Sequence, residues 1–463
     1  MIRHPPDHDF PEEPMKKNLT TGSVFRTLLQ FSLPFLLSYF LQTLYGMADL
    51  FIIGRFNGVE STTAVSIGSQ VMHMLTVMIV GLAMGSTVMI GRAIGGNQKQ
   101  EAEVAIGNTV TLFMTLSVVL AAVLIALVKP ITAVMSTPAE AVPGTVSYLT
   151  ICFLGIPMIT AYNIISSVFR GMGDSQSPMW FVLVACIANI ALDYLFIGGM
   201  HLGPAGAALG TTLAQTVSVL VSLWIIRRRN TGLSLTKDDL RPRKPAMGGL
   251  LRVGVPVALQ DGFIQISFLV ITVIANQRGL NDAAAVGIVE KIIGVLFLVP
   301  SSMLSSVSAL AAQNLGAGRR DRAVRTLGYA VALCVGFGLV SAAVMQLAAE
   351  PFVGLFAKDN GEVIRLGSQY LRGYVWDCVF AGIHFCCSGY FCACGRSGFS
   401  FFHNAVSIVC ARIPLAYLAS VRFPDTLFPM GLATAAGSCL SVIICVILLL
   451  WMRNREPAEP EGL

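Results

Sequence analysis

Apolar residues recur in twelve long stretches along the chain, and short polar segments separate them. Each stretch reaches the roughly 20 residues that a helix needs to cross the hydrocarbon core of a bilayer. The apolar residues are continuous rather than alternating with polar ones, which predicts helices and not the strands of a barrel. The predicted spans are residues 27–54, 62–91, 102–128, 144–170, 178–199, 203–226, 248–276, 284–312, 323–348, 366–392, 398–420 and 427–452.

The composition agrees with this pattern. Of the 463 residues, 55% are hydrophobic and 12% are charged, whereas a soluble globular chain has about 25% charged residues. This proportion argues against a soluble enzyme and against a disordered chain. The net charge of +6 is modest and its charges are scattered, so we expect no nucleic-acid partner. The fold class predicted is an all-α polytopic membrane protein with 12 transmembrane helices in two pseudo-symmetric six-helix bundles.

The distribution of Lys and Arg predicts the orientation. If the N-terminus is cytoplasmic, the segments on the cytoplasmic side hold 22 of the 31 basic residues and the opposite loops hold 6. Such a bias predicts that both termini are cytoplasmic. Residues 1–17 are polar, and we do not expect them to be a signal peptide because no short apolar core with a cleavage site follows.

An internal repeat divides the chain into two halves. The segment Leu28–Pro34 (LLQFSLP) is similar to Leu250–Pro256 (LLRVGVP), and the segment Ala93–Ala102 is similar to Asn314–Ala323, at offsets of 222 and 221 residues. An even number of spans in each half gives both copies the same orientation, with a binding cavity between them. The predicted organisation is a cytoplasmic tail (1–26), an N-lobe (27–226), a cytoplasmic linker (227–247), a C-lobe (248–452) and a second cytoplasmic tail (453–463).

Four polar residues of the first half are predicted to share one depth in the membrane. Asp49 and Asp193 lie near the outer ends of the first and fifth spans, and Thr211 lies a similar distance into the sixth. At ~1.5 Å per residue all three are about 8–12 Å below the outer surface. Asn189 precedes Asp193 by one helical turn, on the same face. Such a set of oxygens can bind a hard cation, or its two carboxylates can share a proton.

The second half provides an internal control for this set. At the same offset its residues are apolar, namely Ile271, Leu415 and Ala411. The lobe architecture therefore does not require the polar residues, which favours a functional role. The alternative is a buried polar network that only holds helices together.

Other polar residues in the spans allow two interpretations each. Six charged residues could form interhelical pairs or line a cavity: Asp261, Glu290, Lys291, Arg372, Asp377 and Arg412. His73 lies among methionines that could line a promiscuous cavity or simply pack. A cluster of cysteines around His384 raises the question of a metal, but the Cys392-x-Cys394 spacing is not a standard zinc pattern, so we expect packing and no metal site.

The ordered set of motifs resembles the multidrug and toxic compound extrusion (MATE) family over about residues 20–452. The motifs are Pro34, Gln42–Asp49 (QTLYGMAD), Ile90–Asn97 (IGRAIGGN), Phe169–Asp174 (FRGMGD), Asn189 with Asp193, and Gly203–Thr211 (GPAGAALGT). The resemblance implies cation-driven efflux by alternating access in a bacterial inner membrane. Its DNA-damage-inducible-protein-F-like branch implies cation coupling at Asp49, Asn189, Asp193 and Thr211, and a substrate cavity lined by Gln42, Tyr45 and Asn163. Another large branch has a Glu where this chain has Ile264, so coupling is placed in the first half.

We therefore expect a secondary antiporter, not an enzyme, that exports amphipathic, cationic organic compounds in exchange for Na⁺ or H⁺. It would need no organic cofactor and would work as a monomer in the lipid bilayer. A lipid-linked glycan flippase of the same superfamily is the alternative, although such a protein should have a strongly cationic cavity. A membrane enzyme or receptor is a third possibility, but no catalytic constellation is apparent.

Overall fold

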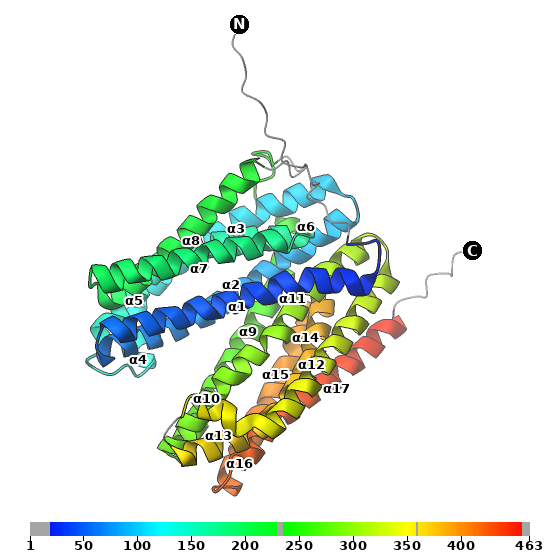
Figure 1. Ribbon diagram of the computed structural model, residues 1–463. Coiled ribbons are helices and arrows are strands. Elements are labelled where there is room, and N and C mark those ends of the chain that lie inside the picture. Colours follow the sequence, from blue (N-terminus) through cyan, green and yellow to red (C-terminus); the bar gives the residue numbers. More distant parts are fainter. Residues whose placement is uncertain (1–18, 229–234, 358–359, 456–463) are drawn as a thin grey trace.

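The computed structural model describes residues 19–228, 235–357 and 360–455, and these residues form helices without any strand. Figure 1 shows the helices in chain order. Their bounds are α1 Val24–Phe56, α2 Val59–Gly95, α3 Lys99–Ala126, α4 Val128–Val134, α5 Val142–Leu154, α6 Ile156–Met172, α7 Gln176–Asp193, η1 Tyr194–Gly199, α8 Gly203–Arg228, α9 Lys244–Arg278, α10 Leu280–Leu296, α11 Leu298–Gly316, α12 Arg320–Gly354, α13 Gly361–Tyr374, α14 Asp377–Ala393, α15 Ser397–Ser407, η2 Ile408–Arg412, α16 Ile413–Arg422 and α17 Phe428–Arg455.

These helices provide the predicted number of membrane spans. Among the described residues, ten helical segments are long and apolar enough to cross a bilayer, and two bent pairs bring the number to twelve. The pairs are α5–α6, bent by 48°, and α13–α14, bent by 41°. The sequence predicted one uninterrupted span for each pair. The first bend is at Gly155, and Pro157 follows it in the first turn of α6, where a missing N–H prevents the preceding helix from continuing. The predicted polar N-terminal segment 1–17 lies outside the described residues.

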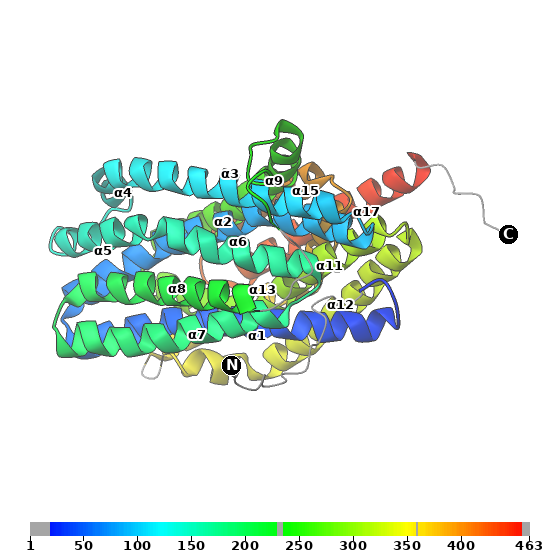
Figure 2. The same cartoon turned by 90° about the horizontal axis from the view of Figure 1, so that it is seen from above.

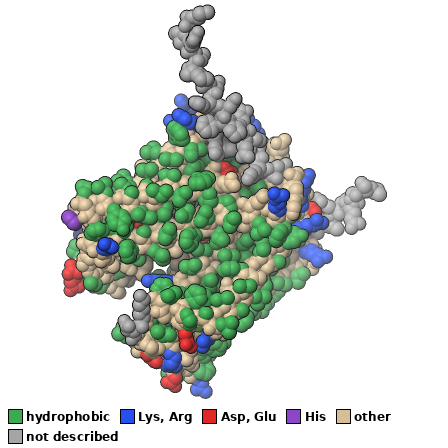
Figure 3. Space-filling model, in the orientation of Figure 1, with side chains coloured by type: hydrophobic (Ala, Val, Ile, Leu, Met, Phe, Trp, Pro, Cys, Tyr) green, Lys and Arg blue, Asp and Glu red, His purple; other side chains and the backbone are tan. Residues whose placement is uncertain are grey.

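The helices are arranged in two bundles. We call α1–α8 the N-lobe and α9–α17 the C-lobe. The two lobes converge at one end of the molecule and diverge at the other (Figure 1), and the long helices run lengthwise when the molecule is seen from above (Figure 2). We call these the closed end and the open end. The space-filling surface is recessed between the lobes at the open end, and hydrophobic side chains cover most of the outer face shown (Figure 3), as expected for a surface in contact with lipid.

Two hydrogen bonds join the lobes at the closed end. Arg92 at the end of α2 donates from Nε to the carbonyl oxygen of Ala393 in α14, at 2.8 Å. Gln313 at the end of α11 donates from Nε2 to the carbonyl oxygen of Gly171 in α6, also at 2.8 Å. Donors and acceptors are related by the repeat offset of 221–222 residues. The two hydrogen bonds are therefore related by the pseudo-symmetry of the lobes, and we call this pair of bonds the latch.

Close backbone approach accompanies the latch. A Cβ atom at Gly95 would collide with the carbonyl of Gln313, and one at Gly316 would collide with the carbonyl of Arg92. These glycines are also related by the repeat. Because each lobe places a glycine against the other lobe's latch donor, the two backbones can meet there without intervening side chains.

The segments that precede each lobe also bind the opposite lobe. Ahead of α1, the carbonyls of residues 20–22 accept hydrogen bonds from Arg319 and Arg322 of the C-lobe. Ahead of α9, Asn108 of α3 donates to the Asp239 carbonyl and accepts from the backbone N–H of Arg243. The linker predicted as 227–247 is shorter in the structure, since α8 continues to Arg228 and α9 begins at Lys244. Its described part is docked on α3.

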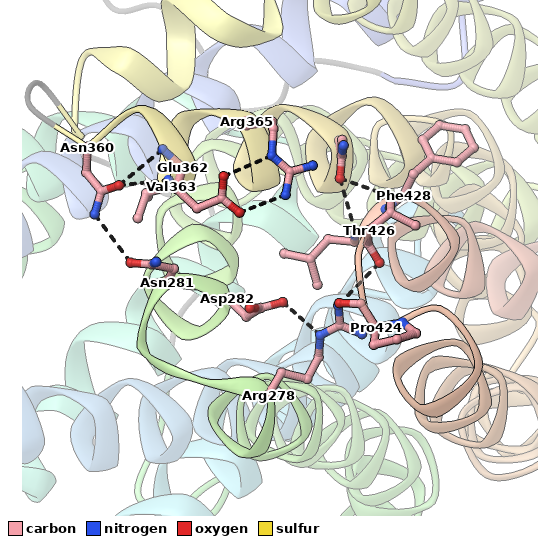
Figure 4. Close-up of polar contacts among 12 residues, drawn as sticks. Arg278, Asn281, Asp282, Asn360, Glu362, Val363, Arg365, Pro424, Thr426 and Phe428 are labelled. Atoms are coloured by element: carbon pink, nitrogen blue, oxygen red, sulfur yellow. Dashed lines mark hydrogen bonds and ion pairs between the residues drawn. The ribbon is translucent and has the colours of Figure 1, made fainter.

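A buried arginine organises the open end of the C-lobe. Arg278, the last residue of α9, donates to four carbonyls between Ser420 and Thr426 and pairs with Asp282 at 2.7 Å. Figure 4 shows this contact beside the Asn360 cap of α13 and the Glu362–Arg365 pair. The guanidinium satisfies carbonyls at and beyond the end of α16 that have no partner within that helix. It therefore fixes α9, α10 and α16 to one another.

Candidate cation site

The four polar residues predicted at one depth meet inside the N-lobe. Asp49 comes from α1, Asn189 and Asp193 come from α7, and Thr211 comes from α8. The Thr211 hydroxyl donates to Asp49 Oδ2 at 3.2 Å. The side chains of Asn189 and Asp193 are close enough to interact with the Asp49 carboxylate. Three helices thus converge on one cluster of oxygen atoms.

This cluster is enclosed and incompletely paired. Asp49, Asn189 and Asp193 are 5%, 2% and 0% exposed. Oδ1 of Asp49, both Asp193 carboxylate oxygens and both polar atoms of the Asn189 amide have no hydrogen-bond partner by distance and angle. A buried carboxylate without a partner is costly in an apolar interior unless a proton or a cation neutralises it. The arrangement therefore suits reversible binding of a small positive ion.

Local backbone features bring Asp193 into the cluster. The helix changes to the π-helical segment η1 directly after Asp193, and such segments occur frequently at functional sites. On the facing helix α8, a Cβ atom at Gly210 would collide with Asp193 Oδ1. Glycine at this position lets the carboxylate lie against the α8 backbone, next to Thr211.

The three residues predicted to line a substrate cavity lie deeper in the same lobe. Gln42 and Tyr45 share the face of α1 that carries Asp49, at spacings of three and four residues, and both are half-buried. Asn163 of α6 is buried, and its amide donates to the Ile159 carbonyl one turn earlier. The structure places Gln42 and Tyr45 beside the cluster, whereas the Asn163 amide is hydrogen-bonded within its own helix.

The sequence reasoning missed the partners of these side chains. Tyr45 interacts with Gln215 of α8, and Gln42 interacts with Tyr162 of α6. Further along α6, Arg170 is buried and is close enough to Tyr162 to interact with it. Together these side chains form a polar path through the N-lobe that begins at the cation cluster.

A signal for this path was present in the sequence. Gln215 follows Thr211 by four residues, and Arg170 follows Tyr162 by eight, so each repeats the helical period of a polar face. The sequence did not show which neighbouring helix each of these polar faces contacts.

The charges of the C-lobe spans are mostly paired. Arg412 lies 3.6 Å from the Asp377 carboxylate and donates to the Tyr374 hydroxyl at 2.7 Å. Arg372 pairs with Glu350 at 3.4 Å. The Thr272 hydroxyl donates a hydrogen bond to Glu290 at 3.3 Å, and Lys291 is exposed. Interhelical pairing therefore accounts for Asp377, Arg412 and Arg372, and Arg372 does not share a pair with Asp377.

The cysteine and histidine cluster is packed without a metal-ligating arrangement. Within the described part of the chain, no group of three or more His, Cys, Asp and Glu side chains is placed to hold a metal ion. His384 packs edge-on against His403 of α15, with ring centroids 5.6 Å apart, and His403 makes hydrogen bonds with Ser388 and Ser441, at 2.9 and 2.6 Å. All eleven cysteines are free thiols.

Comparison with known proteins places the chain in a family. The MatE family model matches residues 34–195 and 256–418, which are the two halves of the repeat. Among curated relatives, the probable multidrug resistance protein YpnP of Bacillus subtilis is 26% identical over 95% of this chain and 98% of its own length. The probable multidrug resistance protein YoeA of B. subtilis is 28% identical over 78% and 79%. The FAD transporter of Shewanella oneidensis is 25% identical over 96% and 98%.

Solved structures share the fold. A crystal structure of MATE in complex with MaL6 superimposes with a TM-score of 0.88 at 22% identity, over 96% of this chain and 98% of that one. A multidrug resistance MATE family transporter of the MOP superfamily, solved in an outward-facing conformation, gives 0.87 with the same identity and coverage. The MatE model matches more than half of this chain, in both halves of the repeat. The chain therefore belongs to the MATE family of membrane transporters and is not an enzyme.

Proposed function

We propose that this transporter is a secondary antiporter that exports amphipathic, cationic organic compounds in exchange for Na⁺ or H⁺. The observation that carries the proposal is the enclosed cluster of Asp49, Asn189, Asp193 and Thr211. Its carboxylate, amide and hydroxyl oxygens are the ligands that hard cations prefer, and two adjacent carboxylates in an apolar setting can also share a proton. The multidrug resistance names of several relatives agree with export of organic compounds.

Ion binding would act through α1. Asp49 belongs to this helix, whereas Asn189, Asp193 and Thr211 belong to α7 and α8, so neutralising the cluster changes how tightly α1 is held against the other two. Gln42 and Tyr45 lie on the same face of α1 and would shift with it, changing the polar path where we propose that substrate binds. The ion can drive this change only by binding one conformation more tightly than the other.

The proposed orientation places the closed end in the cytoplasm. Arg92, Arg319, Arg322 and Arg396 lie at that end, as the excess of basic residues on the cytoplasmic side requires. The open end then faces outward, both termini are cytoplasmic, and the protein spans a bacterial plasma membrane as a single working chain.

The flippase alternative requires a cationic central cavity. The C-lobe cations do not supply one, because Arg412 and Arg372 are paired with carboxylates and Lys291 is exposed. Because one relative is named as a FAD transporter, FAD should be tested as an anionic substrate in the transport assay described below.

The test is transport in proteoliposomes under separately clamped Na⁺ and pH gradients. The wild type should extrude a lipophilic cation such as ethidium, driven by one gradient alone, and should not move FAD. The Asp49→Asn and Asp193→Asn proteins should be folded but inactive with either gradient. Asp425→Asn, which makes the same change in the exposed loop before α17, is the matched control and should transport normally.

Gradient-driven transport by the Asp49→Asn protein at the wild-type rate would refute the assignment of the coupling site. Movement of FAD but not of cations would overturn the proposed substrate class.

A further inference from the structure

Asp261 lies at the middle of the molecule, between the two lobes. It is 17 residues from each end of α9, or about 25 Å from each end at the helical rise. Its Oδ2 faces α2 of the other lobe, 3.0 Å from where a Cβ atom of Gly81 would stand. Transporters built from repeated lobes bind substrate at this depth, where the lobes meet.

The Asp261 carboxylate has no partner among the residues that the structure describes. No cation in the described ranges pairs with it, and no hydrogen bond to it is formed there; the neutral thiol of Cys392 in α14 is near enough to interact with it, and the Asp261 side chain is half-buried. It therefore differs from Asp377 of the same lobe, which has Arg412. A lone carboxylate near the centre of a bilayer is strongly unfavourable, and a positively charged ligand would stabilise it.

The repeat shows what this position looks like when its role is structural. At the offset of 222 residues, Asp261 corresponds to Tyr39 of α1. Tyr39 also faces the other lobe, and its hydroxyl is hydrogen-bonded to Ser305 of α11 at 2.9 Å. At this position the N-lobe residue Tyr39 forms a neutral hydrogen bond with the C-lobe, whereas the C-lobe residue Asp261 places a carboxylate against Gly81 of the N-lobe. The unpaired charge is not needed to join the lobes.

The surroundings of Asp261 suit a lipophilic cation. Toward the closed end, the α2 and α9 backbones touch at Leu82 and Gly254, which seals that side. One turn toward the open end, the side-chain nitrogens of His73 in α2 and Gln265 in α9 lie 3.5 Å apart.

The next residue on α9, Gly262, faces Met78, whose sulfur lies 3.5 Å from the place of a Cβ atom there. Methionine is polarisable and adapts to apolar ligands of varied shape. The site therefore combines one negative charge with an apolar, polarisable wall, and the polar contact of His73 with Gln265 lies on its outer side.

We propose that Asp261 is the counter-ion for the positively charged group of the transported compound, in a site between the lobes with His73 and Gln265 at its outer side. This inference rests on the proposed export of organic cations, and it separates substrate binding from ion coupling at Asp49. The two carboxylates belong to different lobes, so each can be tested without the other.

The experiment is equilibrium binding of tetraphenylphosphonium and ethidium to the purified full chain in detergent, without any ion gradient. Asp261→Asn keeps size and polarity but removes the charge, and it should weaken binding at least tenfold. Tyr39→Phe, at the repeat-related position, should bind within about twofold of the wild type. Asp261→Glu should recover part of the affinity. Size-exclusion profiles establish that each variant is folded.

A second measurement needs no variant. Dicyclohexylcarbodiimide should modify Asp261 in the wild type, as read by mass spectrometry, and tetraphenylphosphonium should protect it. Unchanged affinity in Asp261→Asn, absence of protection, or a wild type that binds neither cation would overturn the inference. Asp261-dependent binding without gradient-driven transport would instead refute the antiporter and leave this site standing.

Discussion

The latch at the closed end gives the most quantitative prediction. Arg92→Ala removes a hydrogen bond donated by a charged group. Such a bond stabilises a protein by about 1.5–3 kcal/mol after the lost hydrogen bonds to water are taken into account. Because this bond joins the lobes, its loss should act on the balance between conformations more than on the stability of either lobe. A loss of about 2 kcal/mol corresponds to a shift of about 30-fold toward the state in which the present closed end is open.

The matched variant is Gln313→Ala, which removes the repeat-related bond from a neutral donor. A neutral hydrogen bond contributes about 0.5–1.5 kcal/mol, so this shift should be smaller, roughly 2- to 13-fold. Lys99→Ala serves as the control, since Lys99 is a cation at the same end whose ion pair among the described residues is with Glu103 of its own helix.

The assay is electron–electron distance measurement between spin labels at Val134 and Leu280. These residues are 84% and 86% exposed, lie near the open end and belong to different lobes. The wild type should give a long distance, and Arg92→Ala should add a shorter component as the open end closes. A distance distribution in Arg92→Ala identical to that of Lys99→Ala would refute the latch.

Three further predictions concern the packing of the two lobes. Gly210→Ala should abolish gradient-driven transport while the protein stays in the membrane, because the new methyl group occupies the place of the Asp193 carboxylate; normal transport rates would contradict this. Arg278→Ala should destabilise the C-lobe by about 3 kcal/mol or more, since it leaves Asp282 and several carbonyls unpaired, and a thermal unfolding midpoint equal to the wild type would show otherwise. Hydrogen bonds from the Thr236 hydroxyl and N–H hold the pKa of Asp239 below its usual range. Docking of the linker should therefore be complete above about pH 4 and weaken only as the pH falls through the lowered value. A spin label in the linker would report the release, and Asp239→Asn should release it at neutral pH.

The sequence alone predicted the spans, the repeat and a common level for three polar residues of the N-lobe. Apolar length sets which segments cross a bilayer, and the fixed rise of a helix converts position in the chain into depth. That is why Asp49, Asp193 and Thr211, which are far apart in sequence, could be predicted at one level before any contact was known.

Which helix faces meet depends on how the helices pack against one another. The rotation of a helix about its axis is set by packing against its neighbours, and the sequence of one helix does not contain that information. It was packing that paired Arg412 with Asp377, placed Gln215 against Tyr45, and left Asp261 opposite a glycine. The bend near Trp376 likewise depends on how two half-helices fit against other spans, because hydrophobicity alone does not distinguish a bent span from a straight one. The bend at Gly155, by contrast, has a local cause in Pro157.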